Sequence, residues 1–158
     1  MRALALLLLA AAAGCAYRLG PAEPVAGARS IALPIFDNRT FRRGLEADLA
    51  RALVSEVHAR TRLRVLDAGA DLVLEGTIVD CQETVLSQDE SQATRESTVF
   101  VTVEWVLRDG RTGEPVGPRD RLTEREAFVP GIGESLRTAR AEAMRRLAAD
   151  LVDRLEAR

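Results

Sequence analysis

TVFVTVEWVLR, residues 98–108, is the stretch that decides the fold class. Apolar side chains occupy every second position of it, at Val99, Val101, Val103, Trp105 and Leu107. Successive side chains of a strand point to opposite faces, so this alternation predicts a strand with one buried and one solvated face. Strands of that kind belong to antiparallel sheets that are covered on one side only.

Further strands are predicted on both sides of this stretch, at Ser30–Phe36, Leu63–Leu66, Leu72–Leu86 and Val116–Phe128. Pro34 has no amide donor, which places the first strand at an edge or a bulge. Gly76 is expected to mark a bulge. Around it, the alternation puts Leu74 and Ile78 on one face and Cys81 on the other.

Two segments have apolar residues at helical spacing, Gly44–Arg60 and Glu134–Glu156. The second carries the longer stripe, made of Leu136, Ala143, Met144, Leu147, Leu151 and Leu155. The order is strand, helix, several strands, helix. It predicts an α+β domain in which two amphipathic helices pack on one face of a mostly antiparallel, four- to five-stranded sheet.

The N-terminus has the pattern of an export signal. Arg2 supplies a positive charge, and an apolar run of leucine and alanine follows from Ala3 to Ala13. This run is shorter than the roughly 20 residues that span a bilayer. Ala12-Ala13-Gly14-Cys15 resembles the bacterial lipobox, in which the cysteine receives a lipid. An ordinary secretory signal with an incidental cysteine is the alternative.

We therefore expect a lipoprotein signal peptide at residues 1–14, with diacylglycerol and an N-acyl chain on Cys15. A tether rich in Gly, Pro and Ala follows at residues 15–29, and residues 30–158 form a single domain. Two or more acyl chains hold a protein firmly on a membrane. Ala16 stands where an aspartate often retains lipoproteins at the inner membrane, so an outer-membrane address is expected.

Composition and charge exclude several classes of function. The chain has 22 basic residues, all arginine, and 24 acidic residues, for a formal net charge of −2. A nucleic-acid-binding domain normally shows a basic excess, so we predict no such partner. His58 is the only histidine, and Cys81 is the only thiol besides Cys15. We predict no enzyme, no metal site and no cofactor apart from the lipid, with Cys81 as a small packed residue and His58 at the surface.

Several short motifs resemble one known family in the same order. Cys15-Ala16-Tyr17-Arg18-Leu19 resembles the Cys-Gly-Tyr-Arg-Leu opening of the LPS-assembly lipoprotein family LptE, with alanine in place of the usual glycine. Ser30–Thr40 (SIALPIFDNRT), followed by Gly44-Leu45-Glu46, is similar to the family's first strand and helix start. Ala70–Gly76 (ADLVLEG) resembles its next strand, and the alanine-rich last helix fits as well.

The resemblance implies a lipid-anchored protein on the periplasmic side of the outer membrane. It would plug an LptD-like β-barrel, help the barrel to fold and assist delivery of lipopolysaccharide to the outer leaflet. A second reading is a periplasmic lipoprotein of the curli-secretion or penicillin-binding-protein-activator type, which assembles or activates envelope machinery. Those proteins also open with a strand ending near Pro-Phe, then a helix.

Arginines are concentrated in one predicted strand. Arg119, Arg121 and Arg125 share a face by their period of two, and Arg108 is expected nearby. Guanidinium groups form forked hydrogen bonds to carboxylates and phosphates, so these four are candidate contacts to lipid A phosphates or to acids of the barrel. The other interpretation is ordinary cross-strand pairing with acids such as Glu104.

Overall fold

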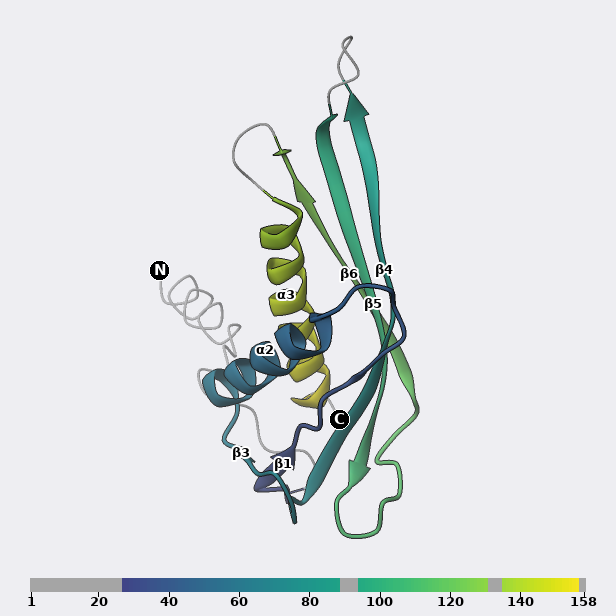
Figure 1. Cartoon of the computed structure of the whole chain (residues 1–158). Helices are drawn as coiled ribbons and strands as arrows, with labels where there is room; N and C mark the ends of the chain where they lie inside the picture. The colour runs from purple at the N-terminus through teal and green to yellow at the C-terminus, as the bar shows by residue number, and fades with distance from the viewer. Residues whose placement is uncertain (1–26, 89–93, 131–134, 157–158) are drawn as a thin grey trace, which may run out of the picture.

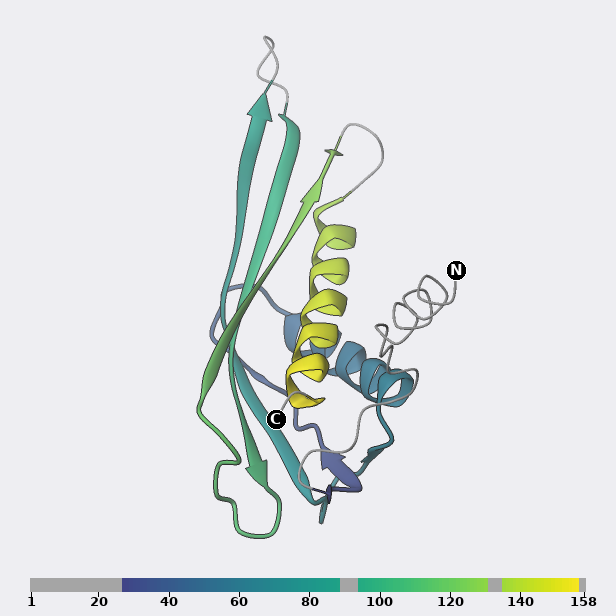
Figure 2. The ribbon, with the colours of Figure 1, turned by 180° about the vertical axis from the view of Figure 1, so that it is seen from behind.

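The computed structural model describes residues 27–88, 94–130 and 135–156. Within these residues one six-stranded sheet carries two helices on one of its faces (Figures 1 and 2). The strand order is β3-β1-β4-β5-β6, and β2 pairs with β4. The elements are β1 (Ser30–Ala32), β2 (Asp37–Asn38), α2 (Leu45–Arg60), β3 (Arg64–Val65), β4 (Leu72–Gln88), β5 (Thr94–Asp109), β6 (Asp120–Phe128) and α3 (Leu136–Glu156). The predicted α+β class and one-sided helix packing are confirmed.

The antiparallel part of the sheet is built on β5, which contains the alternating stretch. It pairs with β4 on one side and β6 on the other. Trp105, Val101 and the other alternating apolar residues face the helices and are buried. Burial of a large apolar side chain contributes roughly 1.5–3 kcal/mol, so this strand supplies much of the core. Figure 1 shows β4 and β5 extending together beyond the ends of the helices.

The sheet is mixed because β1, β2 and β3 pair in parallel. The expected strand Ser30–Phe36 ends at Ala32, two residues before Pro34, which cannot donate to the ladder. Asp71 holds β1 in register: its carboxylate accepts the N–H groups of Arg29 (2.8 Å) and Ser30 (3.0 Å) and the Ser30 hydroxyl (2.9 Å). These hydrogen bonds, the one from Arg29 first, lower the pKa of Asp71. Ala28 is already buried, so packing begins two residues before the expected start of the domain.

Gly76 does not mark a bulge, contrary to the prediction. Its role is to leave room for Phe36, because a methyl group at Gly76 would overlap the Phe36 ring. Phe36 is buried in the core. The nearest register shift lies between Ile78 and Asp80. That shift turns Cys81 to the helix-covered face, opposite Val101, so the predicted facing of Cys81 was also wrong.

Helix α2 begins at a turn built by three residues of the Asn-x-x-x-x-x-Gly-Leu-Glu stretch. Gly44 adopts φ +88°, a left-handed conformation that glycine accepts at little cost. The Asn38 amide donates to Glu46 Oε2 (2.7 Å) and to the Arg42 carbonyl oxygen (2.7 Å). The stripe Leu45, Leu49, Leu53 and Val57 is buried, and α2 packs against α3.

The close approach of Phe36 to Gly76 gives the first prediction. Gly76→Ala should lower the free energy of unfolding by roughly 1–3 kcal/mol, as overpacking does in a dense core. Urea denaturation of the purified protein measures this. Adding Phe36→Leu should recover part of the loss, since the smaller side chain leaves room for the methyl group. Strictly additive costs of the two substitutions would show that the contact does not limit packing.

Two carboxyl groups should affect stability with opposite pH dependence. Glu124 on β6 has a raised pKa because burial and then a hydrogen bond with Asp150 of α3 disfavour its charged form. Its effect is therefore a loss of stability as pH rises above its ordinary pKa of 4.5. Glu124→Gln should raise the melting temperature at pH 7 and leave it little changed at pH 4.

Glu142 is the matched control on α3. Hydrogen bonds from Arg145 lower its pKa from 4.5 to about 2. A lowered pKa gives stability that is present above 4.5 and disappears as pH falls toward 2. Glu142→Gln should therefore lower the melting temperature at pH 7. The same pH response in both variants would contradict these assignments.

Candidate functional site

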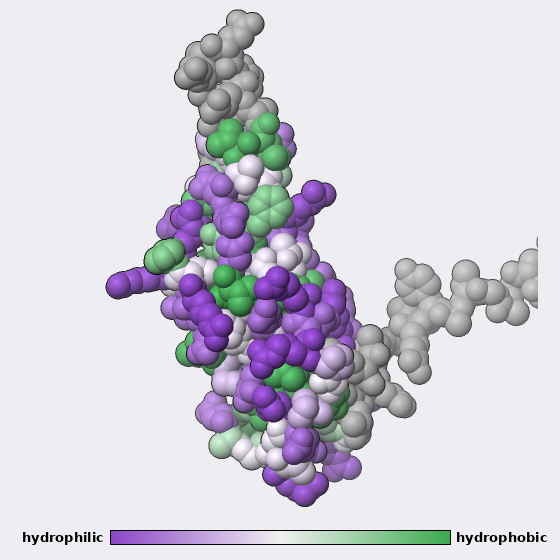
Figure 3. All heavy atoms as spheres, turned by 90° about the vertical axis from the view of Figure 1, so that its right-hand side faces the viewer, coloured by the Kyte–Doolittle hydropathy of each residue, from purple (hydrophilic) through white to green (hydrophobic). Residues whose placement is uncertain are grey.

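The face of the sheet turned away from the helices is the candidate functional surface, hereafter the open face. The alternate residues of β4, β5 and β6 that point away from the core form it, and they include Glu75, Thr102, Glu104, Arg121 and Arg125. Figure 3 looks onto this side of the molecule, where hydrophilic side chains predominate. A solvated sheet face needs no polar recognition chemistry to be stable, so its unpaired charges are informative.

Ion pairs use two of the four predicted arginines. Arg121 bonds Glu104 across the β5–β6 ladder at 2.7 Å. Arg108 bonds Glu75 at 2.8 Å and the Gly113 carbonyl oxygen at 3.0 Å. Cross-strand pairing, the alternative interpretation, therefore describes these two. The structure brings Arg119 and Arg125 to the exposed surface, and neither makes an ion pair within the described residues.

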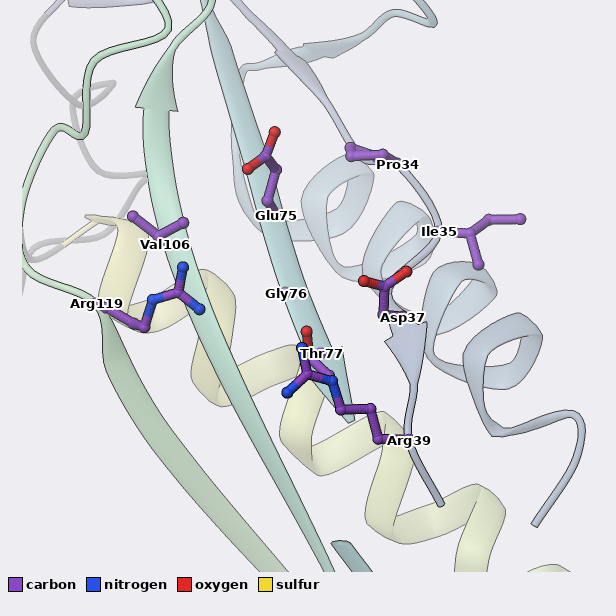
Figure 4. A pocket seen from close by; sticks show the side chains of 9 residues that line it. All are labelled: Pro34, Ile35, Asp37, Arg39, Glu75, Gly76, Thr77, Val106 and Arg119. Atoms are coloured by element: carbon purple, nitrogen blue, oxygen red, sulfur yellow. The ribbon is translucent and has the colours of Figure 1, made fainter. Parts of the chain in front are cut away.

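Arg119 lines a pocket of about 340 Å³ on the open face (Figure 4). Arg39, which follows β2, lies across the pocket from it, and the two guanidinium groups extend toward each other over Thr77 and Val106. Arg39 also lacks an ion pair within the part of the chain that is described. Two arginines from segments 80 residues apart thus meet only in the fold.

The pocket also contains two carboxylates, Asp37 and Glu75. Glu75 is engaged by Arg108, whereas Arg39 and Arg119 keep their donors available. Each guanidinium offers a planar fork of N–H groups that fits a carboxylate or phosphate. The arrangement can therefore hold an anionic group between the two arginines, with Thr77 beneath it.

Sequence reasoning missed Arg39 because Asp37–Thr40 has the composition of a plain polar turn. In the fold, the backbone N–H of Arg39 donates to the Ile78 carbonyl oxygen at 3.0 Å, which fixes Arg39 beside β4. The Asn38 side chain fixes the residues that follow, since its Oδ1 accepts the Thr40 N–H at 2.9 Å. The only available signal was that Arg39 adjoins the motif residue Asn38.

The remaining chemically reactive residues do not form a site. His58 is exposed in the last turn of α2. Cys81 is half-buried, and burial raises the pKa of its thiol. No group of three potential metal ligands occurs in residues 27–88, 94–130 and 135–156. Neither described helix is long and apolar enough to cross a bilayer. Cys15 lies outside the described residues.

Solved structures share this fold at low sequence identity. A hypothetical protein from Chlamydia trachomatis is 12% identical, with a TM-score of 0.59 over 80% of this chain and 95% of its own. A minor lipoprotein from Acinetobacter baumannii is 14% identical, with a TM-score of 0.57 over 82% and 93%. A PelC dodecamer from Paraburkholderia phytofirmans is 16% identical, with a TM-score of 0.56 over 89% and 96%. No curated protein matches the sequence.

A family model gives the assignment that these distant structures do not. The model for LptE, described as lipopolysaccharide-assembly, matches residues 28–158. This range contains both helices, all described strands and the pocket between Arg39 and Arg119. It also contains the Asn38, Gly44 and Glu46 turn that starts α2. The chain belongs to the LptE lipopolysaccharide-assembly family.

Proposed function

We propose that this protein plugs an LptD-like outer-membrane β-barrel and assists lipopolysaccharide transport to the outer leaflet, with its open face against the barrel wall. Family membership supports the partner. The pocket between Arg39 and Arg119 is the observation that carries the choice of face. Its two guanidinium groups suit acidic side chains of a polar barrel interior or phosphates of lipopolysaccharide.

The helix-covered side is less suited to that contact. Arg145 and Arg146 of α3 are both paired with Glu142, and Arg60 of α2 is paired with Glu56 and Asp153. A charge already satisfied within the protein has less to gain from a partner. Electrostatic complementarity of this kind also orients an approaching partner and weakens with salt.

Reversal of the two pocket charges should weaken capture of the barrel. Arg39→Glu/Arg119→Glu, introduced together in the tagged full-length protein, should reduce co-purification of the barrel at least tenfold. Two charge-assisted bonds of about 1.5–3 kcal/mol each exceed the 1.4 kcal/mol that a tenfold change requires. The measurement is the molar ratio of barrel to lipoprotein in detergent extracts, at low and at physiological salt.

Arg137→Glu is the matched control, because Arg137 is exposed on α3. It should leave recovery of the barrel unchanged. Equal loss with Arg137→Glu and with the pocket variant would contradict the choice of face. Failure of the wild-type protein to recover any barrel would contradict the plug itself. Recovery of a pore-forming homo-oligomer or a synthase would favour envelope machinery of the curli-secretion or synthase-activator type.

The lipid anchor on Cys15 is part of the proposal and has its own test. Cys15→Ala should prevent acylation, so palmitate labelling should be lost and the protein should leave the outer-membrane fraction. Two or more buried acyl chains supply most of the membrane affinity, at about 0.8 kcal/mol for each methylene group. Sedimentation and labelling measure the two effects. Unchanged labelling of Cys15→Ala would exclude this cysteine as the acceptor.

A further inference from the structure

Phe41 is an unusually exposed aromatic residue. Its exposed fraction is 107%, the highest of the large apolar residues that are exposed in the described part of the chain, which also include Ile35, Val85 and Leu86. It lies on the connection between β2 and α2, directly after the turn that places Arg39 at the pocket. Phe41 makes no contribution to the core, so the fold does not explain its chemistry.

The backbone around Phe41 is held firmly. Thr40 donates its N–H (2.9 Å) and its hydroxyl (2.8 Å) to Asn38 Oδ1. The Arg42 N–H donates to the Thr40 hydroxyl at 3.2 Å, and the Arg42 carbonyl oxygen accepts the Asn38 amide at 2.7 Å. Both neighbours of Phe41 are therefore fixed. An aromatic side chain presented from a fixed backbone loses little conformational entropy when it binds.

The charge around Phe41 is mainly positive. Arg39 and Arg43 are exposed and Arg42 is partly buried, and none of the three makes an ion pair within residues 27–88, 94–130 and 135–156. The acidic residues of this connection are Asp37 and, in the first turn of α2, Glu46. Glu46 is engaged, because it accepts from Asn38 and from the Gly44 N–H. Any partner surface here should be acidic.

We propose that Phe41 is an anchor that inserts into an apolar pocket within an acidic region of the barrel wall, next to the contact made by Arg39. This inference rests on the proposed plug function and extends its interface from the open face to the β2–α2 connection. Aromatic residues and arginine dominate the binding energy of protein interfaces when the aromatic ring enters a desolvated pocket. Phe41 and its arginines supply both components.

A lipid surface fits these observations less well than a protein pocket. Binding to a bilayer surface increases with the apolar area that is buried, and amphipathic segments supply a whole face for it. Phe41 offers a single ring, and its neighbours Thr40 and Arg42 are polar. One ring gains most in a pocket that surrounds it.

Site-specific photo-cross-linking in whole cells tests the anchor. A benzoylphenylalanine is placed at position 41, at position 119 in the open face, or at position 137 on α3, in the otherwise complete lipoprotein. Cross-linked species are purified through the tag and identified by mass spectrometry. We expect adducts with the LptD-like barrel from positions 41 and 119 and none from position 137.

The outcomes separate the anchor from the plug. Barrel adducts from position 119 without any from position 41 would overturn the anchor while supporting the plug. Adducts of position 41 with lipid, or no adduct from it, would likewise overturn it. Absence of barrel adducts from both positions would contradict both proposals. Equal adducts from positions 41 and 137 would show contact without a preferred face and would also overturn it.

Affinity for the purified barrel gives a second readout. Phe41→Ser should raise the dissociation constant at least tenfold, whereas Phe41→Trp should remain within threefold of the wild type because it keeps an aromatic ring. Ala59→Ser, at an exposed position of α2, is the control and should have no effect. All three variants should melt like the wild type, since both positions are exposed. An unchanged dissociation constant for Phe41→Ser would overturn the anchor.

Discussion

The contact between the Phe36 ring and Gly76 is the constraint on which the remaining architecture depends. Only a residue without a side chain lets the ring lie against the inner face of β4. With the ring buried there, the chain returns to β4 as β2 and reaches the turn that begins α2. The same path places Arg39 over Thr77 and leaves Phe41 in solvent. The core contact thus positions both proposed binding elements.

Local patterns predicted the elements that are periodic and long. The alternation at residues 98–108 and the stripes of α2 and α3 depend on one buried face, which a sequence records directly. The course of residues 33–40 could not be predicted in this way. It is decided by Phe36 and Gly76, which are 40 residues apart, and by a register shift after Ile78 that no local pattern marks. The facing of Cys81 failed for that reason.

The motif residues and the binding residues are different sets. Asn38, Gly44 and Glu46, which carry the family resemblance, build the start of α2 through hydrogen bonds and a left-handed glycine. Charge spacing alone placed Arg119, Arg121 and Arg125 on one surface, but it could not distinguish those that Glu104 or Glu75 would neutralise. Partner choice among arginines depends on strand register, and the pairing of Arg39 with Arg119 depends on tertiary structure.

The central claim is that the open face lies against a barrel wall while the helices face away from it. Electron cryomicroscopy of the purified lipoprotein–barrel complex tests this most directly. The predicted result is a wall carboxylate or a lipid phosphate within hydrogen-bonding distance of both Arg39 and Arg119. A complex in which α2 and α3 contact the wall and the open face borders water would contradict the claim.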